Sequence, residues 1–216
     1  MSTTFCKICS QEVATFFDEQ MQVTTYWCDH CHFCFKDENN IISLEAEKKV
    51  YEQHENSIEN AGYVAMFRDF ITKTITPYKD EINHVLEFGS GPTPVLSQIL
   101  TQDGFNVDNY DKFFAPQKVY ENKVYDLITS TEVIEHIAEV HALFDFFNQH
   151  LRSGGYLALM TQFLPQKRDE YLKWWYRRDP THISFFTPQA LQYLAQQHGF
   201  KRHYHDDKKV ILLRKI

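Results

Sequence analysis

Apolar and polar positions alternate along the chain with two periods, one typical of buried strands and one typical of amphipathic helices. Short apolar runs predict strands at residues 84–88, 105–110, 125–129 and 156–161. Apolar residues spaced by three and four positions predict helices at residues 95–102, 131–150 and 188–198. Because strands and helices follow one another, we expect an α/β fold with a Rossmann-like, doubly wound, mostly parallel sheet that helices cover on both faces.

Two further segments extend this pattern. Residues 45–76 have helical periodicity, which Gly62 would divide into two helices and Pro77 would end. Residues 200–204 and 210–213 lie on either side of the polar sequence HDDKK. We therefore expect a helical connector before the sheet and a C-terminal antiparallel hairpin at its edge.

Composition and charge narrow the class of protein. The 216 residues are 43% hydrophobic and 24% charged, as in an ordinary globular chain. The 29 acidic residues outnumber the 22 basic ones, and a net charge of −7 disfavours nucleic acid as a partner. No apolar run is long enough to span a membrane, and the first residues, MSTTFCKICS, do not resemble a signal peptide. The sequence thus predicts a cytoplasmic protein.

The five cysteines all lie before residue 35. Cys6 and Cys9 form one C-x-x-C pair, and Cys28 and Cys31 form a second pair eighteen residues later. Two such pairs supply the four thiolates of a tetrahedral zinc site, with Cys34 as an alternative to Cys31. Disulfides are disfavoured in a cytosolic protein. With two short strands between the pairs, the segment is predicted to be a zinc ribbon whose metal is structural and supplies folding energy.

A glycine-rich loop follows the first predicted strand of the sheet. Gly89 permits a sharp turn, Gly91 lets the backbone approach a ligand, and Asp111 lies twenty residues later at a strand end, where its carboxylate suits both ribose hydroxyls. Pro94 stands where a dinucleotide fold has its third glycine. Glu87 would repel a pyrophosphate but would face an amino group or a sulfonium. These features favour S-adenosylmethionine over NAD.

In this order, the motifs resemble those of class I S-adenosylmethionine-dependent methyltransferases, over roughly residues 84–216. The matching segments are Val85–Gly91 (first motif), Tyr110–Asp111 (ribose-binding strand end), Tyr125–His136 (fourth-strand motif), Leu151–Leu157 (turn into the fifth strand) and Arg178–Thr187 (a segment with a His near the transfer site). The resemblance implies S-adenosylmethionine as cofactor. Its expected contacts are Glu87, Phe88, Gly89, Ser90, Gly91, Tyr110, Asp111, Ser130 and Thr131.

The sequence departs from this family in one segment. Only thirteen residues lie between Asp111 and Tyr125, where a full-length member has a helix and a third strand. Residues 118–120 would give a minimal strand at most. Phe113 and Phe114 would either stack on the adenine or fill the core, so the adenine contacts stay unassigned.

An acidic and imidazole cluster follows the fourth strand. If a helix begins near Thr131, then Glu132, Glu135 and His136 share its first turn, and together they suit one divalent ion such as Mg²⁺. The string resembles the metal site of ubiquinone-pathway O-methyltransferases and small-RNA 2′-O-methyltransferases, where the ion eases deprotonation of a substrate hydroxyl. Two alternatives stay open: His136 as a positioned base without metal, and acidic side chains that only stabilise a helix N-terminus.

His182 is the other candidate for the transfer site, as a general base or as a ligand beside His136. The expected catalytic residues are His136, His182 and Glu132, and we expect them, with Glu135, around one cavity beside the cofactor's methyl group. The alternative for His182 is an ordinary surface loop. Residues 174–178 (WWYRR) would form an aromatic wall with a cationic rim for an acidic acceptor, or would pack on the core.

The sequence therefore predicts three parts: a zinc ribbon over residues 1–40, a helical connector or lid over 41–83, and a methyltransferase domain over 84–216. We expect an enzyme that transfers a methyl group from S-adenosylmethionine to a small-molecule acceptor, with oxygen as the favoured atom. The alternatives are a nucleotide-sugar or other C-methyltransferase, and a non-catalytic module of this fold that uses the ribbon for protein or RNA contacts. Neither the acceptor nor the oligomeric state follows from the sequence.

Overall fold

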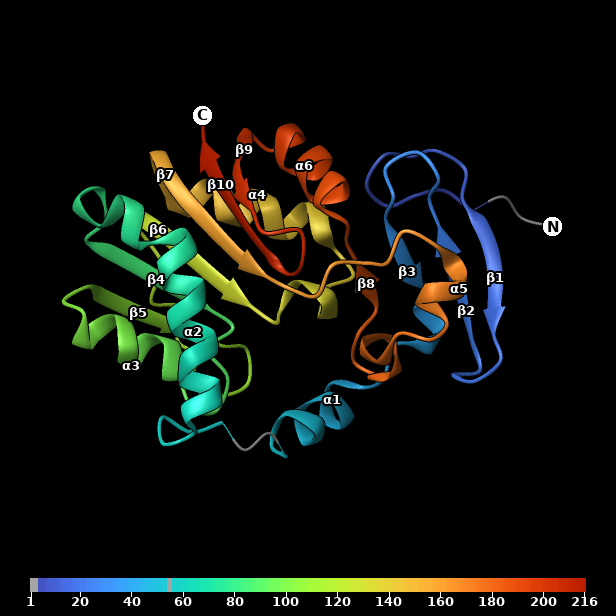
Figure 1. Cartoon of the computed structure of the whole chain (residues 1–216), viewed down its shortest axis with the longest axis horizontal. Coiled ribbons are helices and arrows are strands. Elements are labelled where there is room, and N and C mark those ends of the chain that lie inside the picture. Colours follow the sequence, from blue (N-terminus) through green and yellow to red (C-terminus); the bar gives the residue numbers. More distant parts are fainter. Residues whose placement is uncertain (1–3, 54–55) are drawn as a thin grey trace.

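Six strands form the main sheet of the computed structural model, which describes residues 4–53 and 56–216 (Figure 1). In the order β5-β4-β6-β7-β10-β9, they are β5 (Asn106–Tyr110), β4 (His84–Phe88), β6 (Tyr125–Thr131), β7 (Leu151–Met160), β10 (Val210–Lys215) and β9 (Phe200–His205). The first four are parallel, and β10 runs antiparallel to both β7 and β9. The predicted α/β fold with its C-terminal hairpin is confirmed.

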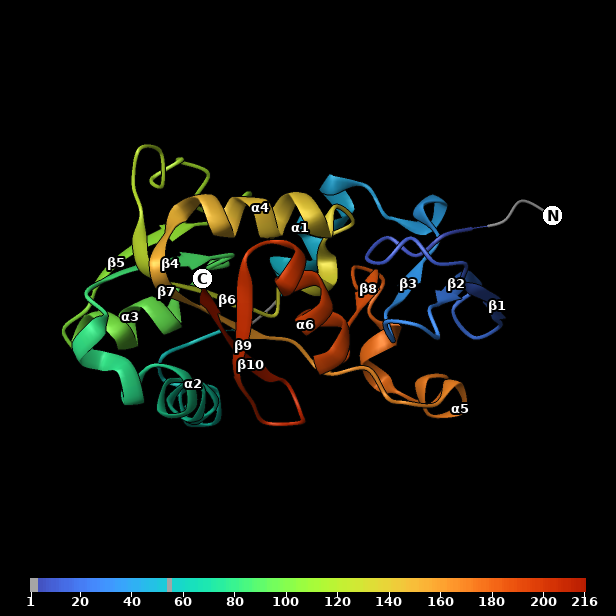
Figure 2. The same ribbon diagram turned by 90° about the horizontal axis from the view of Figure 1, so that it is seen from above.

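Helices cover both faces of this sheet. On one face, α2 (Ala61–Thr74) and α3 (Val95–Gln102) share a buried apolar cluster with Val85 of β4. On the other face, α4 (Val140–His150) and α6 (Pro188–Gln197) share a cluster with the next residue, Leu86, because successive strand residues point to opposite faces. Figure 2 shows the sheet between α4 on one side and α2 and α3 on the other. Within the described residues, no helix combines the length and the apolar character that crossing a bilayer requires.

A second sheet joins the N-terminal residues to the C-terminal half. It consists of β1 (Ala14–Asp18), β2 (Val23–Trp27), β3 (Cys34–Lys36) and β8 (Ser184–Phe185), in that order, with antiparallel pairing throughout. Figure 1 shows β8 and α5 (Arg168–Tyr171) beside the ribbon strands. The Phe33 ring lies 5.0 Å from that of Phe186, so the apolar core of the ribbon continues into the core under α6. The ribbon therefore shares both a sheet and an apolar core with the C-terminal half of the chain.

The connector divides at a different place from the one predicted. A 3₁₀ helix, η1 (Glu38–Asn40), and α1 (Leu44–Tyr51) come first, and α2 begins before Gly62, which lies in its first turn. The reason is an N-cap: the Asn60 side chain accepts a hydrogen bond from Tyr63 N at 3.1 Å. After α2, the chain continues into the 3₁₀ helix η2 (Thr76–Glu81), so Pro77 lies near the start of a helical turn.

The predicted helix over residues 131–150 is wrong in its first part. β6 extends to Thr131, and Glu132 N donates to Met160 O at 2.7 Å, which prolongs the pairing with β7. Glu132 then has a φ of +54°, in the left-handed region that no right-handed helix includes. A 3₁₀ turn, η3 (Ile134–His136), follows, and α4 begins only at Val140. The acidic and imidazole cluster therefore does not share one α-helical turn.

Two smaller expectations also differ. The turn predicted at residues 152–155 belongs to β7, whose register with β6 shifts between Tyr125 and Leu127. Residues 118–120, all of them described, form no strand, so β5 remains the edge of the sheet.

Candidate active site and metal centres

The glycine loop leaves the carboxyl end of β4, where its two glycines have different surroundings. Gly89 has a φ of +83°, and a Cβ placed on it would lie 2.3 Å from Val133 Cγ2. Gly91 has a φ of +67°, and a Cβ there would meet no heavy atom within 4 Å. Gly89 is thus needed for packing, whereas Gly91 borders open space through which a ligand can approach the backbone.

Asp111 connects this loop to the end of β5. One carboxylate oxygen accepts from Gly91 N at 2.9 Å, and the other accepts from Phe113 N at 2.8 Å and Phe114 N at 3.0 Å. The predicted ribose ligand therefore also fixes the backbone on both sides of the cofactor position.

Glu87 lies under the loop, buried at 3% exposure. Its carboxyl accepts from Ser97 N at 3.0 Å and contacts Ser97 Oγ, both in the first turn of α3. Burial raises the pKa of Glu87 to about 7, while the Ser97 hydrogen bonds act in the opposite direction. The side chain thus stabilises the start of α3.

The other predicted cofactor contacts lie around the same strand ends. Ser130, near the end of β6, is buried, and its Oγ has no hydrogen-bond partner in the part of the chain that the structure describes. Phe88 packs into the core, with its ring 5.3 Å from that of Phe147. The Phe113 ring, after Asp111, lies 5.9 Å from that of Tyr51 on α1. A buried hydroxyl such as Ser130 requires a partner, which a ligand would provide.

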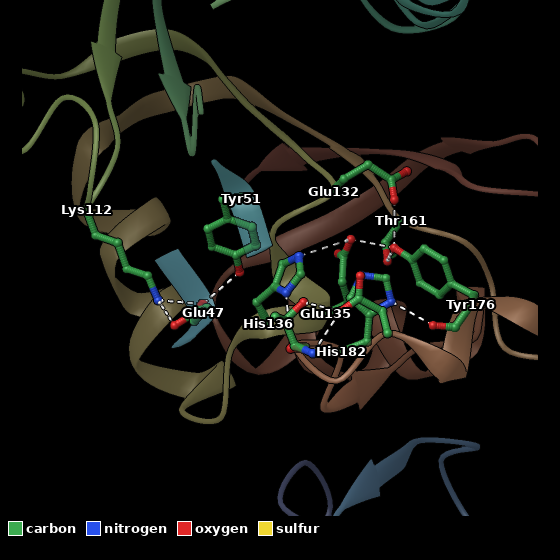
Figure 3. A network of polar contacts seen from close by, with 11 residues as sticks. Glu47, Tyr51, Lys112, Glu132, Glu135, His136, Thr161, Tyr176 and His182 are labelled. Carbon is green, nitrogen blue, oxygen red and sulfur yellow. Dashed lines mark hydrogen bonds and ion pairs between the residues drawn. The ribbon is translucent and has the colours of Figure 1, made fainter. Parts of the chain in front are cut away.

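The structure brings Glu135, His136 and His182 together beyond the end of β6 (Figure 3). One potential ligand atom from each lies within 4.8 Å of the other two. His136 Nδ1 lies 3.1 Å from the carbonyl oxygen of Thr181, and His182 Nδ1 lies 2.8 Å from that of Tyr176. Because a carbonyl oxygen only accepts, each neutral imidazole carries its proton on Nδ1 and its lone pair on Nε2. Proteins orient metal-binding imidazoles in this way.

Burial determines the charge of this cluster. Glu135 is 0% exposed, and its Oε2 has no hydrogen-bond partner among the described residues. Burial, reinforced by the nearby charge of Glu132, raises the pKa of Glu135 well above its usual range. Burial lowers the pKa of His136 to about 3, so this imidazole is neutral at physiological pH. The cluster thus combines a neutral imidazole at His136 with a buried carboxyl group at Glu135 whose protonated form is favoured.

Tyr176, on the 3₁₀ helix η4 (Trp175–Arg178), links the two glutamates. Its hydroxyl lies 2.8 Å from Glu132 Oε2, in contact with Glu135 Oε1, and 3.2 Å from Thr161 Oγ1 (Figure 3). A phenol donates only one proton, so one of the two carboxyl groups must donate in turn. Glu132 therefore lies beside the cluster and is linked to it through Tyr176.

The sequence WWYRR divides between the two predicted environments. Tyr176 and Arg177 are buried in the core, whereas Trp175 is 64% exposed. The sequence did not identify Tyr176 as a link between the glutamates, because nothing in the local pattern indicates contacts with residues 41 and 44 positions away.

Helix α1 covers the cluster on one side. The Tyr51 ring lies 5.2 Å from that of His136, and its hydroxyl donates to Glu47 Oε1 at 2.7 Å. Lys112 Nζ lies 2.8 Å from both carboxylate oxygens of Glu47 (Figure 3). A small cavity of about 20 Å³ borders His136; its lining is Ile41, Ile42, Glu47, His136, Pro180, Thr181 and Ile183. No local pattern marks Glu47 as part of the site, because α1 has the pattern of an ordinary amphipathic helix.

The cysteine cluster contains Cys6, Cys9, Cys28 and Cys31, whose sulfurs all lie within 4.8 Å of one another. Cys6 Sγ is 3.5 Å from Cys31 Sγ, and Cys9 Sγ is 3.4 Å from Cys28 Sγ. Zn–S bonds of about 2.3 Å would place tetrahedral sulfurs about 3.8 Å apart, so the donor set fits zinc with a small expansion. Cys34 is buried on β3 and is not part of this cluster. The geometry thus favours Cys31 over Cys34.

A larger hollow of about 490 Å³ lies elsewhere, at the amino ends of β4, β5 and β6. Its lining is His84, Asn106, Val107, Asp108, Lys123, Val124 and Tyr125. Parallel α/β sheets bind ligands at the carboxyl ends of their strands, so this hollow lies at the edge of the sheet where a ligand is not expected.

Comparison with known proteins gives the family. The model of a methyltransferase-domain family matches residues 17–205. No curated protein matches this chain. The sequence-based recognition of a methyltransferase is confirmed by this match, which covers most of the chain.

Solved structures show the same fold. Human N-acetylserotonin methyltransferase in complex with SAM is 14% identical, with a TM-score of 0.55 over 79% of this chain and 54% of that one. Magnesium protoporphyrin IX methyltransferase from Synechocystis PCC 6803 with bound SAH is 14% identical, with a TM-score of 0.51 over 81% and 95%. The chain spans only 55%, 55% and 58% of the first three structures that it matches. This chain belongs to the methyltransferase-domain family and has the Rossmann-like fold of class I S-adenosylmethionine-dependent methyltransferases.

Proposed function

We propose that this protein transfers the methyl group of S-adenosylmethionine to a hydroxyl oxygen of a small molecule. The observation that carries the proposal is the pair of imidazoles, His136 and His182, whose Nδ1 atoms are held by backbone carbonyls beside the buried Glu135. A hydroxyl is a weak nucleophile until it loses its proton, whereas a thiol or an amine needs less help. A site equipped for deprotonation therefore favours oxygen.

The cofactor would lie across the carboxyl ends of β4 and β5. Gly91 leaves its approach open, Asp111 would accept from the ribose hydroxyls, and Ser130 has a hydroxyl to donate. When bound, S-adenosylmethionine supplies an electrophilic methyl group on its sulfonium. The remaining contribution of the protein is to orient the acceptor in line with that methyl group and to exclude water.

We further propose that Glu135, His136 and His182 hold a divalent cation. Two imidazole nitrogens and one carboxylate oxygen suit Mn²⁺ or Fe²⁺ better than Mg²⁺, which prefers oxygen ligands. Such an ion would lower the pKa of an acceptor hydroxyl bound to it. His136 as a base without metal fits less well, because its pKa of about 3 is far from the value near 7 of an efficient base.

Mn²⁺ binding to the zinc-loaded protein, followed by electron paramagnetic resonance, tests the cation site. We expect one Mn²⁺ per chain for the wild type and at least roughly tenfold weaker binding for Glu135→Gln, which loses a ligand charge. Glu139→Gln is the matched control, because Glu139 is exposed and lies just beyond the cluster. Unchanged Mn²⁺ binding in Glu135→Gln would exclude this ligand set.

Production of S-adenosylhomocysteine with catechol, thiol and amine acceptors tests the reaction. The proposal expects turnover with the catechol and a large loss in Glu135→Gln. Turnover with amines or thiols alone would contradict oxygen as the acceptor atom.

A further inference from the structure

The segment from Tyr176 to Ile183 determines how both candidate histidines are oriented. It carries His182 itself and the carbonyl of Tyr176, which accepts from His182 Nδ1 at 2.8 Å. It also carries the carbonyl of Thr181, 3.1 Å from His136 Nδ1. Its first three residues end the 3₁₀ helix η4, and residues 179–183 belong to no helix or strand, so regular secondary structure fixes the segment only in part. Something else must hold these two carbonyls in place.

Lys36, on ribbon strand β3, reaches into this segment. Its Nζ lies 3.0 Å from the carbonyl oxygen of Arg177 and 3.0 Å from that of Asp179, 141 and 143 residues further along the chain. The side chain is buried, with 3% of the residue exposed. Burial lowers the pKa of Lys36 to about 8, and nearby Asp179 and Asp18 oppose this change. A buried ammonium group costs free energy unless it donates hydrogen bonds, and Lys36 Nζ donates to both of these carbonyl oxygens.

The backbone of Lys36 completes the attachment. Lys36 N donates to Ile183 O at 2.9 Å, and Ile183 N donates to the carbonyl of Glu135 at 2.8 Å. The next residue, Ser184, begins β8 and pairs with Phe35 of β3. A continuous series of hydrogen bonds thus runs from the ribbon strand through Ile183 to the residue that carries the buried carboxyl.

A second buried cation, Arg177 of this segment, reaches back to the ribbon. Arg177 Nε lies 3.3 Å from Asp18 Oδ2 at the end of β1, and Arg177 Nη2 lies 2.8 Å from Gln20 Oε1. Arg177 and Asp18 are each 1% exposed. Two ribbon strands, β1 and β3, therefore contribute charged side chains to contacts with this one short segment.

We propose that Lys36 is a positioning residue of the transfer site. By anchoring the carbonyls of Arg177 and Asp179, its ammonium keeps the flanking carbonyls of Tyr176 and Thr181 where they fix the Nδ1–H tautomers of His182 and His136. A residue of the ribbon, outside the main sheet, thus orients the two imidazoles and fixes their tautomers. The effect on turnover rests on the proposed function, whereas the effect on the tautomers does not.

Nitrogen-15 NMR of histidine-labelled, zinc-loaded full-length protein tests this inference, because long-range proton–nitrogen correlations distinguish the two tautomers. His136→Asn and His182→Asn assign the signals. We expect both imidazoles to be Nδ1–H tautomers in the wild type and His182 to become a mixture of tautomers in Lys36→Met. The turnover number should fall at least roughly tenfold, as for a small misplacement of reacting groups, while affinity for S-adenosylmethionine stays within about twofold.

Two further variants sharpen the result. Lys36→Arg keeps a cationic donor and should restore much of the wild-type tautomer. Lys7→Met is the matched control: Lys7 is also a ribbon lysine, but its Nζ pairs with Glu38 at 2.8 Å, outside this segment. Lys7→Met should behave as the wild type.

Unchanged tautomers in Lys36→Met would overturn the inference, and so would an equal loss of cofactor affinity and turnover. Shifted tautomers with unchanged turnover in Lys36→Met would support Lys36 as a positioning residue. The same result would contradict the proposed function of His136 and His182 in methyl transfer. If Lys36→Met does not fold, Lys36→Gln, which keeps one donor group, gives the same comparison. A mixed His182 tautomer would then support the inference, and a single Nδ1–H tautomer would overturn it.

Discussion

At the scale of single residues, the carboxylate of Asp111 combines an observed structural role with a predicted binding role. It is the predicted ribose ligand, and it also accepts from Gly91 N, Phe113 N and Phe114 N. An amide at this position has only one oxygen with which to accept, so Asp111→Asn would release part of the loop. A substitution here would change the shape of the proposed cofactor site as well as its charge.

We therefore expect Asp111→Asn to weaken S-adenosylmethionine binding by about 1.5–3 kcal/mol, the scale of hydrogen bonds to a charged group. Calorimetric titration measures this change. Asp108→Asn is the control, because Asp108 lies on the same strand but pairs with Lys123 at 2.7 Å, away from the loop. Equal affinities for wild type and Asp111→Asn would mean that the ribose is held by other residues.

Glu87 makes stability depend on pH. Its pKa rises from 4.5 to about 7 in the folded protein, so the folded state holds this proton more tightly than the unfolded state. The resulting stability is fully present below pH 4.5 and is lost as the pH rises through 7. We expect Glu87→Gln to remove on the order of 1–3 kcal/mol of the decline in unfolding free energy between pH 5 and pH 8.

Urea unfolding at these two pH values measures the effect. Burial also raises the pKa values of Glu132 and Glu135, so the unfolding free energy of Glu87→Gln should still decline somewhat between pH 5 and pH 8. A slope of stability against pH that is identical in wild type and Glu87→Gln would show that Glu87 is ionised in the folded protein throughout.

Individual residues were predictable where a local pattern implies a local geometry. The cysteine pairs, Gly89 with Gly91, and Asp111 at a strand end all follow from spacing along the chain. Tyr176 and Lys36 do not, because their contacts join residues that are distant in sequence, and no short pattern marks a tyrosine or lysine for such a contact.

At the scale of elements, the least predictable region is the connection from β6 to α4. Apolar periodicity after Thr131 predicted a continuous helix. The structure has a left-handed residue at Glu132 and a 3₁₀ turn, and α4 begins at Val140. Periodicity reports which face is buried, but it does not report backbone handedness at a polar residue. The same turn places Glu135 and His136 against His182, so the site depends on the feature that the pattern missed.

The ion pair between Glu47 and Lys112 is one attachment that holds helix α1 over this site. Lys112→Met should remove that attachment and allow α1 to open more often. We expect amide hydrogen exchange over residues 44–51 to accelerate by about three- to tenfold, the range for one partly exposed ion pair. Lys118→Met is the control, because Lys118 pairs with exposed Glu121 at 3.7 Å in the same segment. Equal exchange in all three proteins would show that this ion pair does not hold α1 in place.

At the scale of the whole molecule, the α/β class and the strand sequence followed from the alternation of elements. The shortened segment after Asp111 explains why β5 is the edge of the sheet, with no third strand beyond it among the described residues. The division into residues 1–40, 41–83 and 84–216 stays a prediction. Strand β8 lies within the last range, yet it pairs with β3 in the first. A two-residue strand has too weak a pattern to be recognised in a sequence, so this connection was not predictable.

This pairing leads to a prediction about metal loss. If the four clustered cysteines bind structural zinc, then Cys31→Ser should lose the metal, and the ribbon should loosen together with the segment that β3 holds. We expect faster hydrogen exchange over residues 23–36 and also over 176–185, while 84–111, which does not contact the ribbon sheet through any strand pairing, keeps its protection. Cys34→Ser is the matched control: Cys34 is equally buried on β3 but lies outside the cluster, so this variant should retain its zinc. Elemental analysis confirms the metal content of each protein. Full protection of residues 176–185 in zinc-free Cys31→Ser would show that the transfer site does not depend on the ribbon metal.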